Sequence, residues 1–422
     1  MKHFILSLGM MFAAMSIFAA GNEIVVSDVV LSQNNSSRIV TVSYTLSGEP
    51  AIVTVDFLTN GVSIGEANFS NVSGDVNKLV TKTDSQCTIQ WKPYQSWPDH
   101  IVNGMTAKVT AWLPEEPPDY LVVPLLEKSS TVAYYVSTNA LPEGGLANDI
   151  YRTTHLVMRR IHASGVRWQM GATAADYEQA KKTAVNPSAY ETAHYVTLSK
   201  DYYMGIYPVT QEQYRRFTQS ASLSGDFTGY ADSYMRPRNG ISYNNVRGKS
   251  TTTDHSSVGG SSAIGKLRSY TGIDFDLPSD AEWEYACKAG TTLLLYTGKA
   301  YSEANVYEIA WVYGNSLYSD VNARQTHVVG QKLPNAWGLY DMIGNTLEWC
   351  RDFYVKNLGT DEVVDPVMKS GEHRVVRGFR YNISSNKSYA TTTFRGGENP
   401  GIINGDDGFG FRVMCPITLK FD

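Results

Sequence analysis

Three aromatic motifs in the second half of the chain constrain its fold more than any other feature. They occupy residues 277–286 (LPSDAEWEYA), 335–349 (NAWGLYDMIGNTLEW) and 408–413 (GFGFRV). Ser279 and Glu282 have the spacing of a helix-capping box, and Gly290 is a suitable stop for the short helix that follows. Large aromatic side chains dominate burial in loop-rich proteins. We therefore expect a core that includes Trp283, Trp337, Trp349 and Phe411.

Together these motifs closely resemble the formylglycine-generating enzyme family, also called sulfatase-modifying factors. The resemblance covers residues 151–416 and implies a compact α+β domain related to the C-type lectin fold. Active members of the family oxidise a substrate cysteine to an aldehyde. They use a copper-binding cysteine pair that lies shortly before the final Gly-Phe-Arg.

That cysteine pair has no counterpart in this sequence. The matching stretch, residues 388–395 (SYATTTFR), contains no cysteine, and Ala390 stands where the first one is expected. An alanine has no thiolate to bind copper or to react. The four cysteines of the chain lie elsewhere, at Cys87, Cys287, Cys350 and Cys415. We therefore assign no catalytic residue and do not expect copper.

The resemblance also implies a calcium site at the Gly-Asn-x-x-Glu-Trp segment. The matching positions are Asp341, Gly344, Thr346 and Glu348. Two carboxylates and two backbone carbonyls suit calcium, which prefers oxygen ligands in flexible geometry. The alternative is a tight turn in which Asp341 and Glu348 are bonded to the backbone.

A loop rich in Gly, Asp and Asn precedes the last motif, and in active relatives this loop borders the substrate groove. We predict a binding surface here, formed by Arg395, Glu398, Asn399, Asp406 and Asp407. The alternative is a solvated turn, because Asn, Gly and Asp favour turns for backbone reasons.

The first part of the chain has the pattern of a β-sheet protein. Val40, Val42, Tyr44 and Leu46 alternate with polar residues, and Asn60-Gly61 is a hairpin signal. We predict an immunoglobulin- or fibronectin-like β-sandwich over residues 22–113. The prolines at 117 and 118 mark a boundary, and residues 114–150 are predicted to be a linker with connecting strands.

The N-terminus has the features of a signal peptide over residues 1–20. Lys2 precedes an apolar run at 4–18, and small residues follow at 19–21. We expect an exported protein with no membrane span after cleavage. The net charge is −5 and no basic run is present, so a nucleic-acid partner is not expected.

Two further segments of the second domain are informative. Thr210 and Gln213 form a second capping box, with Tyr214 and Phe217 expected to face inward. Residues 236–260 are rich in Ser, Thr, Asn and Gly, and we predict a long surface loop.

These observations favour one function and leave two alternatives open, of which one is a purely structural exported protein with no groove. The favoured function is an exported binding module for a protein or glycan at the cell surface, without oxidase activity. The other alternative is an oxidoreductase of the formylglycine-generating type, acting on sulfatase cysteines or on another substrate.

Overall fold

The computed structural model describes residues 24–176, 192–220, 232–249, 257–318, 322–383, 390–402 and 408–419. The chain divides into two compact units. Unit 1 contains the chain up to Tyr120 together with Val132–Asn148, and unit 2 contains Leu121–Thr131 together with the chain from Asp149 onward. The predicted linker at 114–150 is thus divided between the units. The predicted signal peptide lies outside the described residues.

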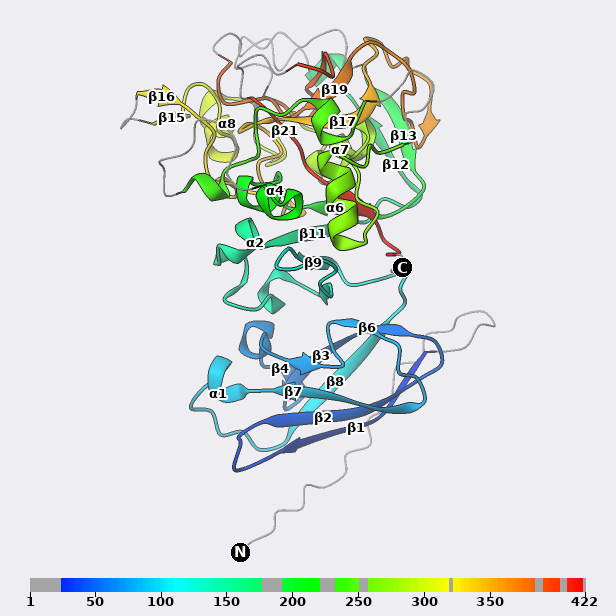
Figure 1. The fold of residues 1–422 in the computed structure, drawn as a ribbon, viewed down its shortest axis with the longest axis vertical. Helices are drawn as coiled ribbons and strands as arrows, with labels where there is room; N and C mark the ends of the chain where they lie inside the picture. The colour runs from blue at the N-terminus through cyan, green and yellow to red at the C-terminus, as the bar shows by residue number, and fades with distance from the viewer. Residues whose placement is uncertain are drawn as a thin grey trace, which may run out of the picture. The chain divides into compact units, whose positions relative to one another are not determined.

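Unit 1 is built from two antiparallel sheets, which Figure 1 shows as separate layers of arrows. The first sheet has the order β1-β2-β7-β5: Val25–Gln33, Val40–Ser47, Ser85–Trp91 and Ser73–Gly74. The second has the order β4-β3-β6, with β8 also paired to β3: Val62–Ser63, Ala51–Thr59, Lys78–Val80 and Met105–Trp112. Short pieces complete the unit: η1 Glu66–Phe69, α1 Pro93–Ser96, β10 Ala133–Tyr135, η2 Thr138–Ala140 and η3 Gly145–Ala147.

The alternating pattern of β2 produces the core of this unit. Val40, Val42, Tyr44 and Leu46 are buried, while the residues between them are partly exposed. Phe57 from the second sheet belongs to the same buried cluster. A β-rich N-terminal region is therefore confirmed, whereas its immunoglobulin-like type stays a prediction.

The Asn60-Gly61 hairpin forms as its sequence predicts. Both residues have positive φ, at 51° and 77°, and they connect β3 to β4 in an antiparallel pair. Two successive positive φ values match the right-handed twist of the flanking strands.

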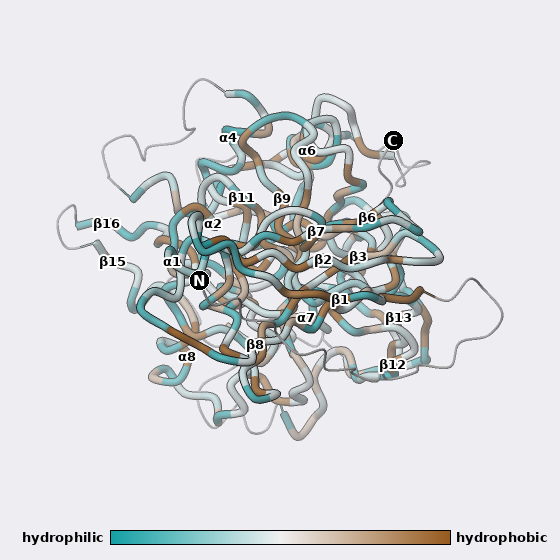
Figure 2. Tube along the Cα trace, turned by 90° about the horizontal axis from the view of Figure 1, so that it is seen from below, coloured by the Kyte–Doolittle hydropathy of each residue, from teal (hydrophilic) through white to brown (hydrophobic). Residues whose placement is uncertain are grey.

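Strand β1 lies at an edge of its sheet and exposes Val25, Val29 and Val30. Its hydrophobic character is visible as a brown stretch in Figure 2.

Unit 2 mixes several small sheets with short helices, as the predicted α+β class requires. One sheet contains β9, β11, β14 and β22 in that order: Tyr120–Pro124, His155–Ile161, Tyr202–Gly205 and Met414–Pro416. A second has the order β20-β19-β17-β21: Arg395–Glu398, Arg374–Arg377, Leu347–Phe353 and Phe409–Gly410. The remaining strands are β12 Val166–Met170, β13 His194–Leu198, β18 Val363–Val364, β15 Leu317–Tyr318 and β16 Ala323–Arg324. The relation to C-type lectins stays a prediction.

The described helices of unit 2 are α2 Ile150–Thr153, α4 Gln211–Thr218, η4 Ser233–Met235, α5 Tyr243–Val246, α6 Ala263–Thr271, α7 Asp280–Lys288 and α8 Glu303–Ile309. Five of them, α4, α5, α6, α7 and α8, begin at a Ser or Thr side-chain cap. Both predicted capping boxes form, at Thr210 for α4 and at Ser279 for α7. Helix α4 lies beside α6, as Figure 1 shows. Within the described residues, no helix has the length and apolar character needed to cross a bilayer.

Three of the four expected core aromatics are fully buried: Trp283, Trp349 and Phe411. Trp337 is only half-buried, and its ring lies edge-on to Tyr285 with the centroids 5.1 Å apart.

The prediction of a long surface loop at residues 236–260 is wrong for its first half. Arg236, Ile241, Tyr243 and Arg247 are buried, and α5 lies within this stretch. Its polar side chains find partners inside the protein. Arg247, for example, pairs with Asp276 at 2.7 Å. Residues 250–256 lie outside the described part of the chain.

Candidate functional site

The segment expected to carry a catalytic cysteine pair is packed into the interior of unit 2. Residues 390–393 are all buried. The Thr392 amide donates to the carbonyl of Leu294 and its hydroxyl donates to that of Leu293, both at 2.9 Å. The expected position of the first cysteine therefore holds only the buried methyl group of Ala390.

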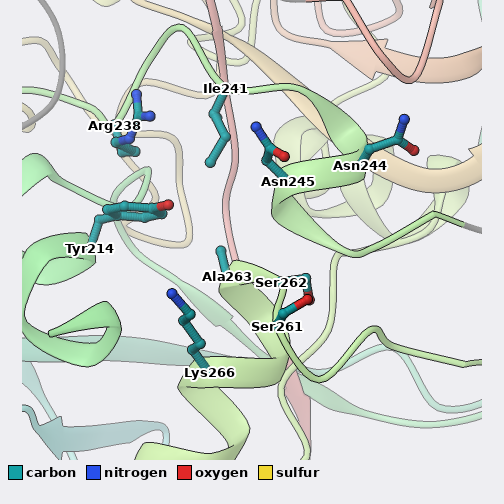
Figure 3. A pocket seen from close by; sticks show the side chains of 9 residues that line it. All are labelled: Tyr214, Arg238, Ile241, Asn244, Asn245, Ser261, Ser262, Ala263 and Lys266. Carbon is teal, nitrogen blue, oxygen red and sulfur yellow. The ribbon is translucent and has the colours of Figure 1, made fainter. Parts of the chain in front are cut away.

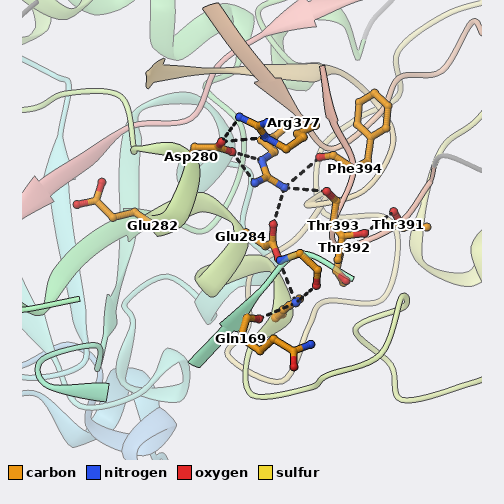
Figure 4. A network of polar contacts seen from close by, with 12 residues as sticks. Gln169, Asp280, Glu282, Glu284, Arg377, Thr391, Thr392, Thr393 and Phe394 are labelled. Carbon is orange, nitrogen blue, oxygen red and sulfur yellow. Dashed lines mark hydrogen bonds and ion pairs between the residues drawn. The ribbon is translucent and has the colours of Figure 1, made fainter. Parts of the chain in front are cut away.

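A network of buried charges connects this segment to helix α7 (Figure 4). Asp280, the first residue of α7, lies between two guanidinium groups, at 2.5 Å from Arg377 and 2.7 Å from Arg395. Burial alone would raise the pKa of Asp280. The two arginines outweigh burial and hold that pKa below its ordinary value.

Arg377 ties the network to the segment itself. It pairs with Glu284 at 2.8 Å and donates to the carbonyls of Thr393 and Phe394 at 3.1 Å each. Figure 4 shows these contacts converging on its side chain. One fully buried arginine thus bridges α7 and the strand that leads into β20.

The network continues through Glu284 to Lys288. Lys288 pairs with Glu284 at 3.0 Å and donates to the carbonyls of Gln169 and Gly171 at 2.9 Å each. Burial opposes the charge on Glu284, but Lys288 and Arg377 hold its pKa below the ordinary value. Each of the two carboxylates is therefore paired with two cationic side chains inside the fold.

Asp352 adds a second buried carboxyl group beside Asp280. Its oxygens accept the backbone N–H groups of Asp280 at 2.9 Å and Met368 at 3.0 Å. Burial, followed by the neighbouring charge of Asp280, raises the pKa of Asp352 to about 7. A buried group of this kind can hold a proton near neutral pH.

The predicted binding residues are placed in different environments. Arg395 is buried and paired with Asp280, which argues against a role in ligand binding. Glu398 is half-buried at the end of β20. Asn399 is exposed, and its side-chain oxygen accepts the N–H of Gly401 at 2.8 Å. Asp406 and Asp407 lie outside the described residues.

The predicted calcium residues all lie in or next to one buried turn. Asp341 accepts the N–H of Gly330 at 2.7 Å and the side-chain amide of Asn345 at 3.3 Å. The N–H of Gly344 donates to the carbonyl of Gly378 at 2.6 Å. Burial raises the pKa of Asp341 to about 6.

Glu348, the second predicted carboxylate ligand, is already neutralised. Arg412 approaches both of its oxygens, at 3.1 and 3.2 Å, and the indole N–H of Trp283 donates to it at 2.7 Å. Among the described residues, no group of three His, Cys, Asp or Glu side chains is arranged to hold a metal ion. In this arrangement the residues do not fit a calcium site. Asp341 matches the alternative of a turn bonded to the backbone, whereas Glu348 is bonded to the side chains of Arg412 and Trp283. Calcium binding itself stays a prediction.

All four cysteines of the chain are buried free thiols. Burial raises the pKa of each one: Cys87, Cys287, Cys350 and Cys415. A thiol reacts and binds metals as its thiolate, and burial in apolar surroundings disfavours that form.

A polar pocket of about 200 Å³ lies between α4, α5 and the start of α6 (Figure 3). The backbone carbonyl of Pro400 accepts the N–H of Asn244, so the predicted binding loop adjoins this pocket. The sequence prediction missed it because residues 236–260 looked like a surface loop. Ser242 and Ser262, which cap α5 and α6, were the available signals.

Comparisons with curated proteins give partial matches. The chain is 28% identical over 233 residues to the serine/threonine-protein kinase pkn1 of Chlamydia pneumoniae, covering 51% of this chain and 33% of that protein. It is 32% identical over 120 residues to the formylglycine-generating enzyme of Bos taurus, covering 27% and 31%. The chain thus spans about a third of the length of these relatives.

Among solved structures, the Treponema denticola variable protein 1 aligns with a TM-score of 0.45 and 26% identity, covering 62% of this chain and 95% of that one.

A family model matches more than half of the chain. The sulfatase-modifying factor enzyme 1-like domain, called FGE-sulfatase, matches residues 158–416. That range takes in the buried network, the Glu348 turn and the polar pocket. Because the match covers more than half of the chain, the protein belongs to the family defined by the sulfatase-modifying factor enzyme 1-like domain.

Proposed function

We propose that this protein is an exported binding protein whose sulfatase-modifying-factor-type domain lacks formylglycine-generating oxidase activity. Its ligand is a protein or a glycan at the cell surface. The observation that carries this proposal is the buried, cysteine-free segment at residues 390–393.

The chemistry of the thiols supports the proposal. An oxidase of this type needs a reactive cysteine pair within reach of a substrate. Every cysteine of the chain is buried, and burial raises its pKa. Burial therefore disfavours the thiolate form that would bind copper or react with a substrate cysteine.

The packing around Ala390 also supports it. Arg377 and the bonds of Thr392 hold the segment against α7 and the turn that follows it. A substrate peptide that approached Ala390 would have to displace these contacts and expose the Asp280 and Glu284 charges.

The deciding experiment is an assay for conversion of a Cys-x-Pro-x-Arg peptide. The full chain is incubated with the peptide, copper, reductant and oxygen, and the peptide is followed by mass spectrometry. We expect the peptide cysteine to stay unchanged while an active formylglycine-generating enzyme converts it in a parallel reaction. Formation of the aldehyde by this protein would refute the proposal.

The similarity to the formylglycine-generating enzyme of Bos taurus keeps one alternative in view. In that alternative the domain is an oxidoreductase that acts on sulfatase cysteines, or on another substrate, through other residues. Aldehyde formation that survives Cys287→Ser and Cys350→Ser would support it. Both substitutions replace a buried thiol with a group of similar size.

A further inference from the structure

The charged residues that line the polar pocket of unit 2 are all positive. Lys266 and Arg238 both line it, and none of the described residues around it is acidic. Lys266 is exposed, so its ammonium group is open to a ligand. Such a cavity attracts negative charge.

Arg238 is the buried one of the two cationic residues that line the pocket. It is only 9% exposed, it donates to the backbone carbonyl of Asn239, and its guanidinium lies 4.9 Å from the centroid of the Tyr214 ring. A guanidinium in this position is held rigidly, and its planar donors suit an oxyanion.

The start of helix α6 adds to the positive electrostatic potential of the pocket. Ser262 lines the pocket and caps α6, accepting the N–H of Gly265 at 3.1 Å. The first turn of this nine-residue helix therefore faces the pocket with its positive dipole end. Lys266 lies one turn further along the same helix.

The rest of the lining suits a hydroxyl-rich ring. Tyr214 gives an aromatic wall, and the side-chain amide of Asn245 supplies both donors and an acceptor. Asn244 also lines the pocket, with its amide directed away from Tyr214 and Lys266 (Figure 3). The volume of about 200 Å³ is below the range of roughly 300–1,000 Å³ that is usual for drug-sized ligands. It suits one sugar unit.

We propose that this pocket binds an acidic sugar, a single sugar ring that carries one carboxylate, sulfate or phosphate group. The oxyanion lies between Lys266, Arg238 and the start of α6, and the ring lies against Tyr214. The inference rests on the proposed function, which it deepens by naming the ligand class of the binding module.

The test is calorimetric titration of the full chain with glucuronic acid, glucose 6-sulfate and glucose 6-phosphate. Glucose tests the need for charge, and inorganic sulfate and phosphate test the need for a ring. We expect at least one acidic sugar to bind about tenfold more tightly than glucose and than either inorganic anion.

Two substitutions locate the binding. Lys266→Met removes the exposed charge, and Asn245→Asp places a negative charge in the lining. Each is expected to weaken binding of the acidic sugar by about tenfold or more. Lys369→Met, at an exposed lysine remote from the lining residues in sequence, is the matched control and should leave the affinity unchanged. Thermal unfolding of each variant checks that the domain is folded.

Four outcomes would overturn the inference. They are no saturable binding of any acidic sugar, equal affinity for glucose, equal affinity for inorganic anions, and unchanged affinity in Lys266→Met. None of them affects the peptide assay. Failure of the pocket and failure of the proposed function are therefore separate results.

Discussion

At the scale of single residues, Arg377 connects the two carboxylates of the buried charge network in unit 2. It is fully buried, it contacts Asp280 and Glu284, and it holds two carbonyls of the segment after Ala390. Removing one partner from a buried ion network leaves uncompensated charge, which costs more than the pair itself contributes.

Replacing Arg377 with Met is therefore expected to destabilise the protein by about 3–5 kcal/mol. Urea denaturation of the full chain measures the change in free energy of unfolding. The control is Lys299→Met, which breaks the exposed pair with Glu308 and should cost about 1 kcal/mol or less. Equal, small effects for both variants would contradict this account of the network.

His327 is the residue with the clearest consequence for pH dependence. Its ring is stacked between Trp311 and Tyr318, with centroid distances of 3.7 and 4.4 Å. Burial lowers the pKa of His327 from 6.5 to about 4. Between these two values the unfolded chain binds a proton that the folded chain does not. The contribution of His327 to stability is therefore full above pH 6.5 and is lost as the pH falls toward 4.

The substitution His327→Phe keeps an aromatic ring in the stack and removes the titration. Compared with wild type, the variant should lose less stability between pH 6.5 and 4. Denaturant titrations across this range measure the difference. His373→Phe, at an exposed site, is the matched control and should follow the wild-type curve. Parallel curves for wild type and His327→Phe would refute the assignment.

At the scale of elements, the turn before β17 requires a glycine at position 344. Gly344 has φ of +84°, and a Cβ there would come within 2.6 Å of the Trp311 carbonyl oxygen. The left-handed backbone and the close approach to backbone atoms of Trp311 both disfavour a side chain at this position.

Gly344→Ala is expected to cost about 2–5 kcal/mol, from backbone strain and overpacking combined. The variant Gly290→Ala measures the cost of backbone strain without overpacking. Gly290 also has positive φ, at +88°, but a Cβ there meets nothing within 4 Å. That substitution should cost only about 1 kcal/mol. Thermal and urea unfolding of the pair give the comparison, and equal costs would show that the close approach does not matter.

The elements that the sequence predicted are those set by local rules. The alternation in β2, the Asn60-Gly61 hairpin and the two capping boxes depend on neighbours a few residues away. Local patterns therefore suffice for them.

The buried network and the pocket depend on distant partners, and the sequence did not predict them. Asp280 and Arg395 are 115 residues apart, and the local sequence around each residue does not predict that they pair. The polar residues of the 236–248 stretch looked solvent-exposed for the same reason. Their partners, such as Asp276 for Arg247, come from other parts of unit 2.

At the scale of the whole molecule, the predicted boundary near residue 150 is close to where unit 2 resumes at Asp149. We predicted a single linker, but Leu121–Thr131 belong to unit 2 and the residues that follow belong to unit 1 again. The hydrophobic pattern of a short strand does not predict which of the two units the strand belongs to.

Export is the prediction that belongs to the chain as a whole. The apolar run at 4–18 should direct secretion, and Leu8→Arg should retain the protein in the cell because a charge interrupts that run. Cell fractionation and the intact mass of the exported form measure both effects. Ser36→Arg, the same change at an exposed site of unit 1, is the control and should leave export intact. Retention of both variants, or of neither, would contradict the signal-peptide assignment.

The position of β22 beside β14 has a consequence for how the chain folds during synthesis. Arg412, just before β22, donates to the carbonyl of Gly205 at the end of β14, although 207 residues separate them. Closing so long a loop is slow, and the partner of β14 emerges last. Until then β14 presents an open edge to other chains. A nascent chain that stalls before residue 408 would keep that edge exposed, so β14 stays unprotected until β22 has been synthesised.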